Sequence, residues 1–264
     1  MTGSLAGKWA LILGASSGFG AATARELAAA GVNIAGVHLD RKGGMVGVEA
    51  LIQELQARKV QTAFFNVNAA DPEKRNEVLD ALTPKLGGVP VIVLMHSLAF
   101  GTLKPYVSED PKARLTKDQM EMTLDVMAHS LVYWVQDLVA RKLLGAGSRV
   151  YAMTSSGGTR VWPTYGAVSA AKAALESHIR QLAMELAPLG ATANAIRAGV
   201  TDTPALRKIP GNAQMMEFAK IRNPHQRMTT PEDVATAIVA LSNSGTGWLT
   251  GNTLGVDGGE DIVG

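Results

Sequence analysis

Short apolar runs of strand length alternate with helix-like stretches along almost the whole chain, and this alternation constrains the fold more than any other feature. Helix-like stretches such as 21–31 and 47–59 separate the runs. Near-continuous apolar strands joined by helical crossovers predict a doubly wound, parallel α/β sheet with helices on both faces. The expected strands are residues 9–13, 32–39, 60–67, 89–97, 148–156, 191–199 and 252–259.

Length and composition narrow the class of protein. A chain of 264 residues suits one domain, so we expect a single binding and catalytic unit over residues 1–264. Scattered Lys and Arg and a net charge of +2 argue against nucleic-acid or membrane-surface partners. Without cysteine there is no disulfide or thiolate metal site, and no histidine spacing suggests a metal. With no membrane-length apolar run and no signal peptide after Met1, we expect a soluble, cytoplasmic protein.

Two stretches interrupt the alternation, namely 98–118 and 200–230. Long irregular segments in compact α/β domains are usually substrate loops or lids. Ligands in open α/β sheets bind beyond the carboxyl ends of the strands, so we expect both stretches at that edge.

One helix start can be predicted from its sequence. A typical helix opening, with Asp as N-cap and Pro in the first turn, is formed by Asp71-Pro72-Glu73.

A glycine-rich turn, Gly14-Ala15-Ser16-Ser17-Gly18-Phe19-Gly20, follows the first strand and opens a helix. Gly14 permits a tight turn, Gly18 lets the backbone approach a pyrophosphate, and Gly20 lets helix and strand pack closely. The competing interpretation is a plain strand–turn–helix connection. The expected cofactor contacts in this turn are Gly14, Ser16, Ser17, Gly18, Phe19 and Gly20.

Further motifs stand in an order that supports the dinucleotide interpretation. They are MTSS (153–156), NAIRAG (194–199) and TGNTLGVDGG (250–259). Together with GASSGFG in the turn, they make the chain resemble the short-chain dehydrogenase/reductase family nearly end to end. The resemblance implies a Rossmann-like fold and an NAD(P) cofactor.

Three departures from the common pattern of that family carry further information. MHSLAF (95–100) stands in place of the usual Asn-Asn-Ala-Gly, and Met127 stands where an active-site Asn is usual. The residue four before Lys172 is Val168 rather than Tyr, and the nearby tyrosine is Tyr165, seven before the lysine.

The Tyr-x6-Lys spacing resembles the enoyl-acyl-carrier-protein (enoyl-ACP) reductases. The glycine turn differs from the corresponding turn of the commonest enoyl-ACP reductases, but it is similar to that of a less common type that uses NADPH. The lid of this type also resembles residues 202–228. Seven residues are almost two helical turns, so Tyr165 and Lys172 can share one face. The displaced phenol suits an enoyl thioester, because hydride attacks the β-carbon while charge develops on the more distant carbonyl oxygen.

The resemblance implies catalytic roles for Tyr165, Lys172 and Ser155. We expect Tyr165 to hydrogen-bond the thioester oxygen and Lys172 to supply positive charge and hold the nicotinamide ribose. Alternatives stay open: Tyr165 as a simple helix cap, Lys172 as a solvated charge, and Ser155 as a hydroxyl bonded to backbone. In the lid, an apolar stripe suits either an acyl chain or a plain core, and its residues are Met215, Met216, Phe218 and Ile221.

Remaining cofactor contacts are also implied by resemblance. Asp40 at the end of the second strand favours NAD, whereas Arg41 and Lys42 favour the extra phosphate of NADP, and we favour NADP. The other expected cofactor contacts are His38, Asp40, Arg41, Asn66, Val67, Ser97, Lys172, Gly199, Val200 and Thr201.

The sequence thus predicts NAD(P)H-dependent reduction of a trans-2-enoyl thioester carried by acyl carrier protein or coenzyme A, as in fatty acid biosynthesis. The alternatives are a ketone/alcohol oxidoreductase and a catalytically weak nucleotide-binding protein. By resemblance we also expect a homotetramer, formed through apolar positions on 119–144 and 165–187.

Overall fold

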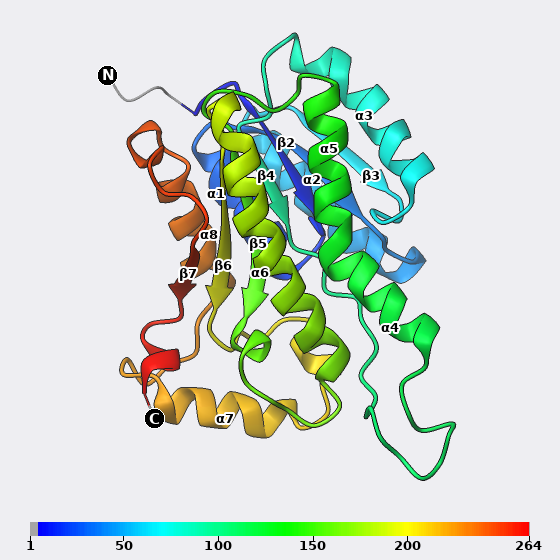
Figure 1. The fold of residues 1–264 in the computed structure, drawn as a ribbon. Coiled ribbons are helices and arrows are strands. Elements are labelled where there is room, and N and C mark those ends of the chain that lie inside the picture. Colours follow the sequence, from blue (N-terminus) through cyan, green and yellow to red (C-terminus); the bar gives the residue numbers. More distant parts are fainter. Residues whose placement is uncertain (1–4, 264) are drawn as a thin grey trace.

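The computed structural model describes residues 5–263, which form a seven-stranded sheet of order β3-β2-β1-β4-β5-β6-β7 (Figure 1). All neighbouring strands pair in parallel. The doubly wound fold expected from the sequence is therefore confirmed, and each expected strand is present. The strands are β1 (Trp9–Leu13), β2 (Asn33–His38), β3 (Thr62–Asn66), β4 (Val93–His96), β5 (Arg149–Ser155), β6 (Thr192–Ala198) and β7 (Thr253–Val256).

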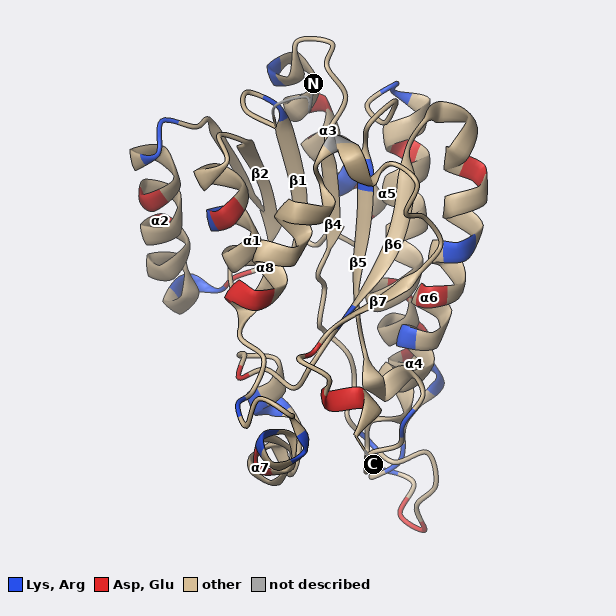
Figure 2. Cartoon of the chain, turned by 90° about the vertical axis from the view of Figure 1, so that its left-hand side faces the viewer, with Lys and Arg blue, Asp and Glu red and all other residues tan. Residues whose placement is uncertain are grey.

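Helices cover both faces of the sheet, as the edge-on view of Figure 2 shows. Helices α1, α2 and α8 lie on one face, α3, α5 and α6 lie on the other, and α7 lies beyond the strand ends. A π-helical turn, Asp125–His129, joins α4 to α5. The helices are α1 (Gly18–Ala29), α2 (Lys42–Ala57), α3 (Pro72–Leu86), α4 (Lys117–Leu124), α5 (Ser130–Ala140), α6 (Gly166–Leu186), α7 (Asn212–Arg222) and α8 (Pro231–Leu241).

Side-chain caps fix where several helices begin. Asp71 accepts hydrogen bonds from the amides of Glu73 and Lys74, which confirms it as the N-cap of α3. Thr116 and Thr230 form capping boxes at the starts of α4 and α8. Helix α2 begins earlier than the expected stretch 47–59, because its first turns contain glycines that weaken the helical pattern in the sequence.

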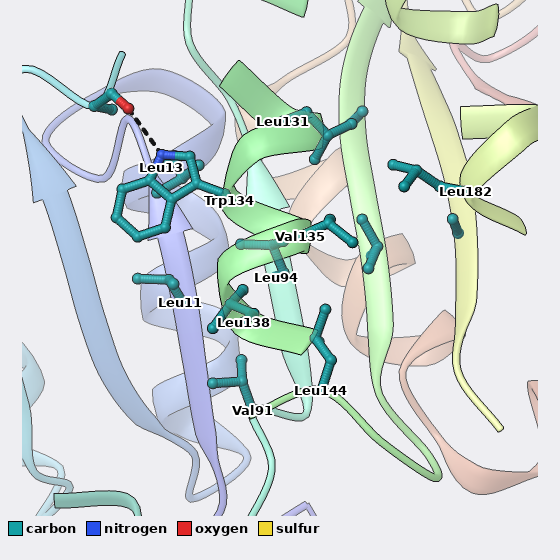
Figure 3. Packing of buried hydrophobic residues seen from close by; sticks show 14 of the residues in the cluster. Leu11, Leu13, Val91, Leu94, Leu131, Trp134, Val135, Leu138, Leu144 and Leu182 are labelled. Atoms are coloured by element: carbon teal, nitrogen blue, oxygen red, sulfur yellow. Dashed lines mark hydrogen bonds between the residues drawn. The ribbon is translucent and has the colours of Figure 1, made fainter. Parts of the chain in front are cut away.

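The core between α5 and the sheet is organised around Trp134 (Figure 3). Its side chain is completely buried and lies among leucines that include Leu11, Leu13 and Leu138. The indole nitrogen donates a hydrogen bond of 2.8 Å to the Ala69 carbonyl. The ring therefore buries a large apolar area without leaving its one polar atom unpaired.

The strand order reverses between β1 and β4. Strands β2 and β3 lie on one side of β1, whereas β4 and the later strands lie on the other. The Ser97 amide, just after β4, donates to the Leu13 carbonyl at 2.8 Å, so the two strand ends meet. A switch point of this kind opens a crevice at the carboxyl ends of the strands.

Within residues 5–263, no helix is both long enough and apolar enough to cross a lipid bilayer.

Candidate active site

A cleft of about 1430 Å³ lies over the carboxyl ends of the strands. Its walls come from the β1–α1 turn, the end of β2, the β5–α6 loop, the loop after β6 and α7. Of the residues proposed from the sequence as catalytic or cofactor-binding, all line this cleft except Gly20 and Asn66. The fold thus gathers side chains from positions 14 to 201 around one space.

The glycine turn depends on its glycines for two different reasons. Gly14 has a φ of 90°, a left-handed conformation that favours glycine. A Cβ on Gly14 would lie 2.5 Å from the Ser97 carbonyl oxygen, and one on Gly20 would lie 2.0 Å from the Gly14 oxygen. Gly20 is therefore a packing residue beneath the cleft, which explains why it does not line it.

The first turn of α1 faces this cleft with its amides available. Ser17 stands at the N-cap position in an extended conformation, and its side chain makes no capping hydrogen bond. An uncapped helix start presents free N–H donors and the positive end of the helix dipole. The turn fits the diphosphate of a dinucleotide on these grounds.

The end of β2 carries a small polar network. His38 Nδ1 lies 2.9 Å from Asp40 Oδ2, and the His38 side chain is buried. Asn66 accepts a hydrogen bond from the Asp40 amide and donates one to the Asp40 carbonyl. Asn66 thus shapes the loop that begins at Asp40, whereas Arg41, which is exposed, lines the cleft itself.

Tyr165 immediately precedes α6, and its half-buried side chain lines the cleft. It makes no side-chain capping bond to the helix. Burial raises the pKa of the Tyr165 phenol, and a hydrogen bond with Ser155 partly opposes that shift. The preceding residue, Thr164, has a φ of 64°, a strained conformation for a β-branched residue of the kind that recurs at functional sites.

Ser155 closes β5 beside this tyrosine. Its hydroxyl oxygen also accepts a hydrogen bond of 3.2 Å from the Gly157 amide. A Cβ on Gly157 would lie 2.5 Å from the Tyr165 ring, so the glycine allows the ring to pack against this turn. The Ser155 hydroxyl therefore bonds the backbone, as one of the two alternatives for this residue predicted, and it also lies beside the phenol of Tyr165.

Lys172 lies buried in the second turn of α6 and reaches the cleft. Its Nζ donates a hydrogen bond of 2.7 Å to the Met153 carbonyl. Burial lowers the pKa of Lys172 to about 8, against a smaller raising effect of Glu176. The lysine is thus a buried group rather than a solvated surface charge, and an ammonium here is suited to hold ribose hydroxyls.

His96, at the end of β4, is a completely buried polar residue that does not line the cleft but lies near Lys172. Its Nε2 lies 2.8 Å from the Ser130 hydroxyl, which donates to the Val126 carbonyl in the π-helical turn. Burial and the charge of Lys172 lower the pKa of His96 to about 3, so the ring is neutral. The turn presents Met127 to the cleft in place of an amide side chain.

The stretch 200–230 contains α7, which closes one side of the cleft. Met215 and Phe218 line the cleft, whereas Ile221 of the same expected stripe is 71% exposed. Trp162, before α6, donates from its indole nitrogen to the Pro210 carbonyl at 3.0 Å. This bond ties the lid to the loop that carries Tyr165.

Two carboxylates near the end of the described chain, Glu260 and Asp261, also line the cleft but were not predicted from the sequence. Glu260 accepts a hydrogen bond from the Val200 amide at 3.1 Å and so supports the loop after β6. Asp261 forms ion pairs with Arg160 and Arg197 at 3.0 Å each. Both acids line the cleft, yet their partners are distant in sequence, so no local motif reveals them.

The fold and the cleft together define a dinucleotide-binding oxidoreductase of the short-chain dehydrogenase/reductase class. A family model described as Enoyl-(Acyl carrier protein) reductase matches residues 14–260. The chain belongs to this family, because the match spans nearly its whole length. The resemblance to the short-chain dehydrogenases/reductases is thereby confirmed.

Individual relatives include reductases of more than one kind. The 1-cyclohexenylcarbonyl-CoA reductase of Streptomyces collinus is 39% identical over 126 residues, which cover 47% of this chain and 45% of that protein. An NADH-dependent enoyl-[acyl-carrier-protein] reductase of a Nostoc species is 28% identical over 98% of each chain. A 3-oxoacyl-[acyl-carrier-protein] reductase of Thermotoga maritima is 25% identical over 97% of this chain and 98% of that one.

Among solved structures, the NADH-dependent enoyl-[acyl-carrier-protein] reductase of Aquifex aeolicus superposes with a TM-score of 0.86. It is 24% identical and covers 99% of each chain, so it shows that the two proteins share a fold.

Proposed function

We propose that this protein reduces the carbon–carbon double bond of a trans-2-enoyl thioester, carried by acyl carrier protein or coenzyme A, at the expense of NADPH or NADH. The observation that carries the proposal is the position of Tyr165. Its phenol lines the cleft at the start of α6, seven residues before the buried Lys172. Support also comes from the family match and from the enoyl reductases among the relatives.

The chemistry follows from where charge develops in the substrate. The bound nicotinamide would supply hydride to the β-carbon of the substrate. The π electrons of the double bond then move toward the carbonyl, the thioester oxygen takes up negative charge, and protonation of the α-carbon completes the reduction. Tyr165 donates a hydrogen bond to that oxygen, and its raised pKa keeps the phenol protonated at neutral pH. Ser155 orients the phenol through their shared hydrogen bond.

The proposal assigns Lys172 to the nicotinamide ribose. Its ammonium lies on the cleft wall and is held by the Met153 carbonyl. Glycines of the β1–α1 turn and the uncapped start of α1 would bind the diphosphate, and Gly199, Val200 and Thr201 would meet the nicotinamide. At the adenosine end, Asp40 and Arg41 both line the cleft, and because the Asp40 carboxylate is engaged by His38, we favour NADPH over NADH.

A second candidate reaction is reduction of a ketone, as the name of the Thermotoga relative suggests. The hydrogen bond between Ser155 and Tyr165 favours it, because two hydroxyls acting together can polarise a single carbonyl oxygen. We propose that either reaction would take place in this same cleft, within a single domain.

The proposal also includes assembly into a homotetramer. Each of α5 and α6 exposes one large apolar side chain, Tyr133 and Met184 respectively, which suit contacts between copies.

A spectrophotometric assay of cofactor oxidation separates the two reactions. Crotonyl-CoA and acetoacetyl-CoA are each tested with NADPH and with NADH. We expect oxidation with crotonyl-CoA, faster with NADPH. A preference for acetoacetyl-CoA would assign the protein to ketone reduction. Tight cofactor binding with neither substrate reduced would instead indicate a nucleotide-binding protein.

A further inference from the structure

Glu176 lies one helical turn after Lys172 on α6, on the side of the lysine that faces β5. Its Oε1 accepts a hydrogen bond of 2.6 Å from the Thr154 hydroxyl. Thr154 is 4% exposed, whereas Glu176 is half-buried. The carboxylate is therefore anchored to the end of a central strand instead of extending into solvent.

The surroundings of Lys172 explain why an anchored carboxylate matters there. Burying an ammonium costs free energy unless an opposite charge or good acceptors compensate it. The Nζ has the Met153 carbonyl as an acceptor, and the charge of Glu176 acts in its favour. On the β4 side, His96 is neutral, and at the start of α6 the Tyr165 phenol is also neutral at pH 7.

Met127, which also lines the cleft, offers no substitute for this charge, because its buried thioether neither carries charge nor donates strong hydrogen bonds. The negative charge of Glu176, four residues further along α6, raises the pKa of Lys172 against the larger lowering effect of burial.

We propose that Glu176 is a positioning residue that acts through Lys172: its carboxylate, one helical turn from the lysine and anchored by Thr154, keeps the buried lysine in its charged form while the Met153 carbonyl holds the Nζ. The consequence for the reaction rests on the role proposed above for Lys172. The electrostatic link between the two side chains can be measured without cofactor or substrate.

The direct test is titration of Lys172 in the cofactor-free protein. Lysine labelled with ¹³C at Cε reports the protonation state by NMR, and the signal is assigned by its loss in Lys172→Arg. In Glu176→Gln the amide can still bond Thr154 but carries no charge, so we expect the pKa of Lys172 to fall by about one unit. Glu176→Asp keeps the charge and should return the titration toward that of the wild type.

Two further variants serve as a comparison and a control. Thr154→Val releases the carboxylate without removing it, and it should lower the lysine pKa by less than Glu176→Gln does. Glu185→Gln changes an acid farther along α6 that bonds Gln181, so Lys172 should titrate as in the wild type. Since Thr154→Val removes the hydrogen bond that anchors the Glu176 carboxylate, it provides a second test if Glu176→Gln does not fold.

The same shift should appear in function. The alkaline limb of the pH–rate profile with crotonyl-CoA, and of the cofactor affinity measured by calorimetry, should move about one pH unit lower in Glu176→Gln. An unchanged lysine titration in both Glu176→Gln and Thr154→Val would overturn the inference, even in an active enoyl reductase. A shifted titration in a protein that does not reduce crotonyl-CoA would uphold the inference and reject the proposed reaction.

Discussion

The protonation states of a few side chains decide what the cleft can do. Tyr165 is held protonated by burial, Lys172 is close to its titration point at neutral pH, and His96 is neutral. A neutral phenol is a hydrogen-bond donor, and a nearby ammonium lowers the cost of charge on the atom that accepts from it. The sequence predicted Tyr165 and Lys172 as catalytic residues. It did not predict the burial that raises the pKa of Tyr165 and lowers the pKa of Lys172.

Replacing Tyr165 by Phe removes the proposed donor to the thioester oxygen. We expect turnover with crotonyl-CoA to fall by about 10²-fold or more, with cofactor affinity unchanged. Steady-state kinetics and fluorescence titration of the cofactor measure the two effects. Tyr106→Phe is the matched control, because the Tyr106 ring packs against Gly166 at the start of the same helix. If Tyr106→Phe lost turnover and Tyr165→Phe did not, the donor would be misassigned.

Lys172 should make cofactor affinity depend on pH. Its pKa is lowered to about 8, so the ammonium is present below pH 8 and is lost as the pH rises above it. Affinity should therefore weaken above pH 8 in the wild type. In Lys172→Ala it should be weaker at pH 7 and should lack this alkaline transition. Isothermal calorimetry across pH 6 to 10 gives both curves. An alanine variant with unaltered affinity would exclude contact between the lysine and the ribose.

At the scale of elements, periodicity and helix-start signals predicted the strands and α3 well. The beginning of α2 was missed, because Gly43 and Gly44 lie inside its first turn. The π-helical turn at Asp125–His129 was also not predicted; Ser130, which follows it, contacts His96 of β4, and such a tertiary contact leaves no local pattern in the sequence. Helix α7 forms within a stretch that the sequence indicated only as a lid.

The β1–α1 element makes a prediction about stability. A methyl group on Gly20 would overlap the Gly14 carbonyl, so Gly20→Ala should destabilise the fold by about 2 kcal/mol or more. Gly43→Ala is the control. It lies in α2 with nothing within 4 Å of the added carbon, so alanine there should be neutral or slightly stabilising. Thermal unfolding followed by circular dichroism compares them. Equal melting temperatures for Gly20→Ala and the wild type would refute the close packing.

At the scale of the whole molecule, strand order brings together residues that are far apart in the chain. The fold class, the cleft at the strand ends and most of its lining were predictable, because each depends on local pattern or on motif order. Glu260, Asp261 and the bond between Trp162 and Pro210 were not, because each depends on how the last segment and the lid pack across the site. Such contacts leave no periodic signal in the sequence.

Transfer of deuterium tests the central claim of enoyl reduction most directly. NADPH deuterated at the transferable position of the nicotinamide is incubated with crotonyl-CoA in ordinary water, and the product is analysed by mass spectrometry and NMR. We predict butyryl-CoA with one deuterium on the β-carbon and a proton from solvent on the α-carbon. Failure to form butyryl-CoA, together with deuterium on the carbinol carbon of 3-hydroxybutyryl-CoA when acetoacetyl-CoA is supplied, would contradict the account.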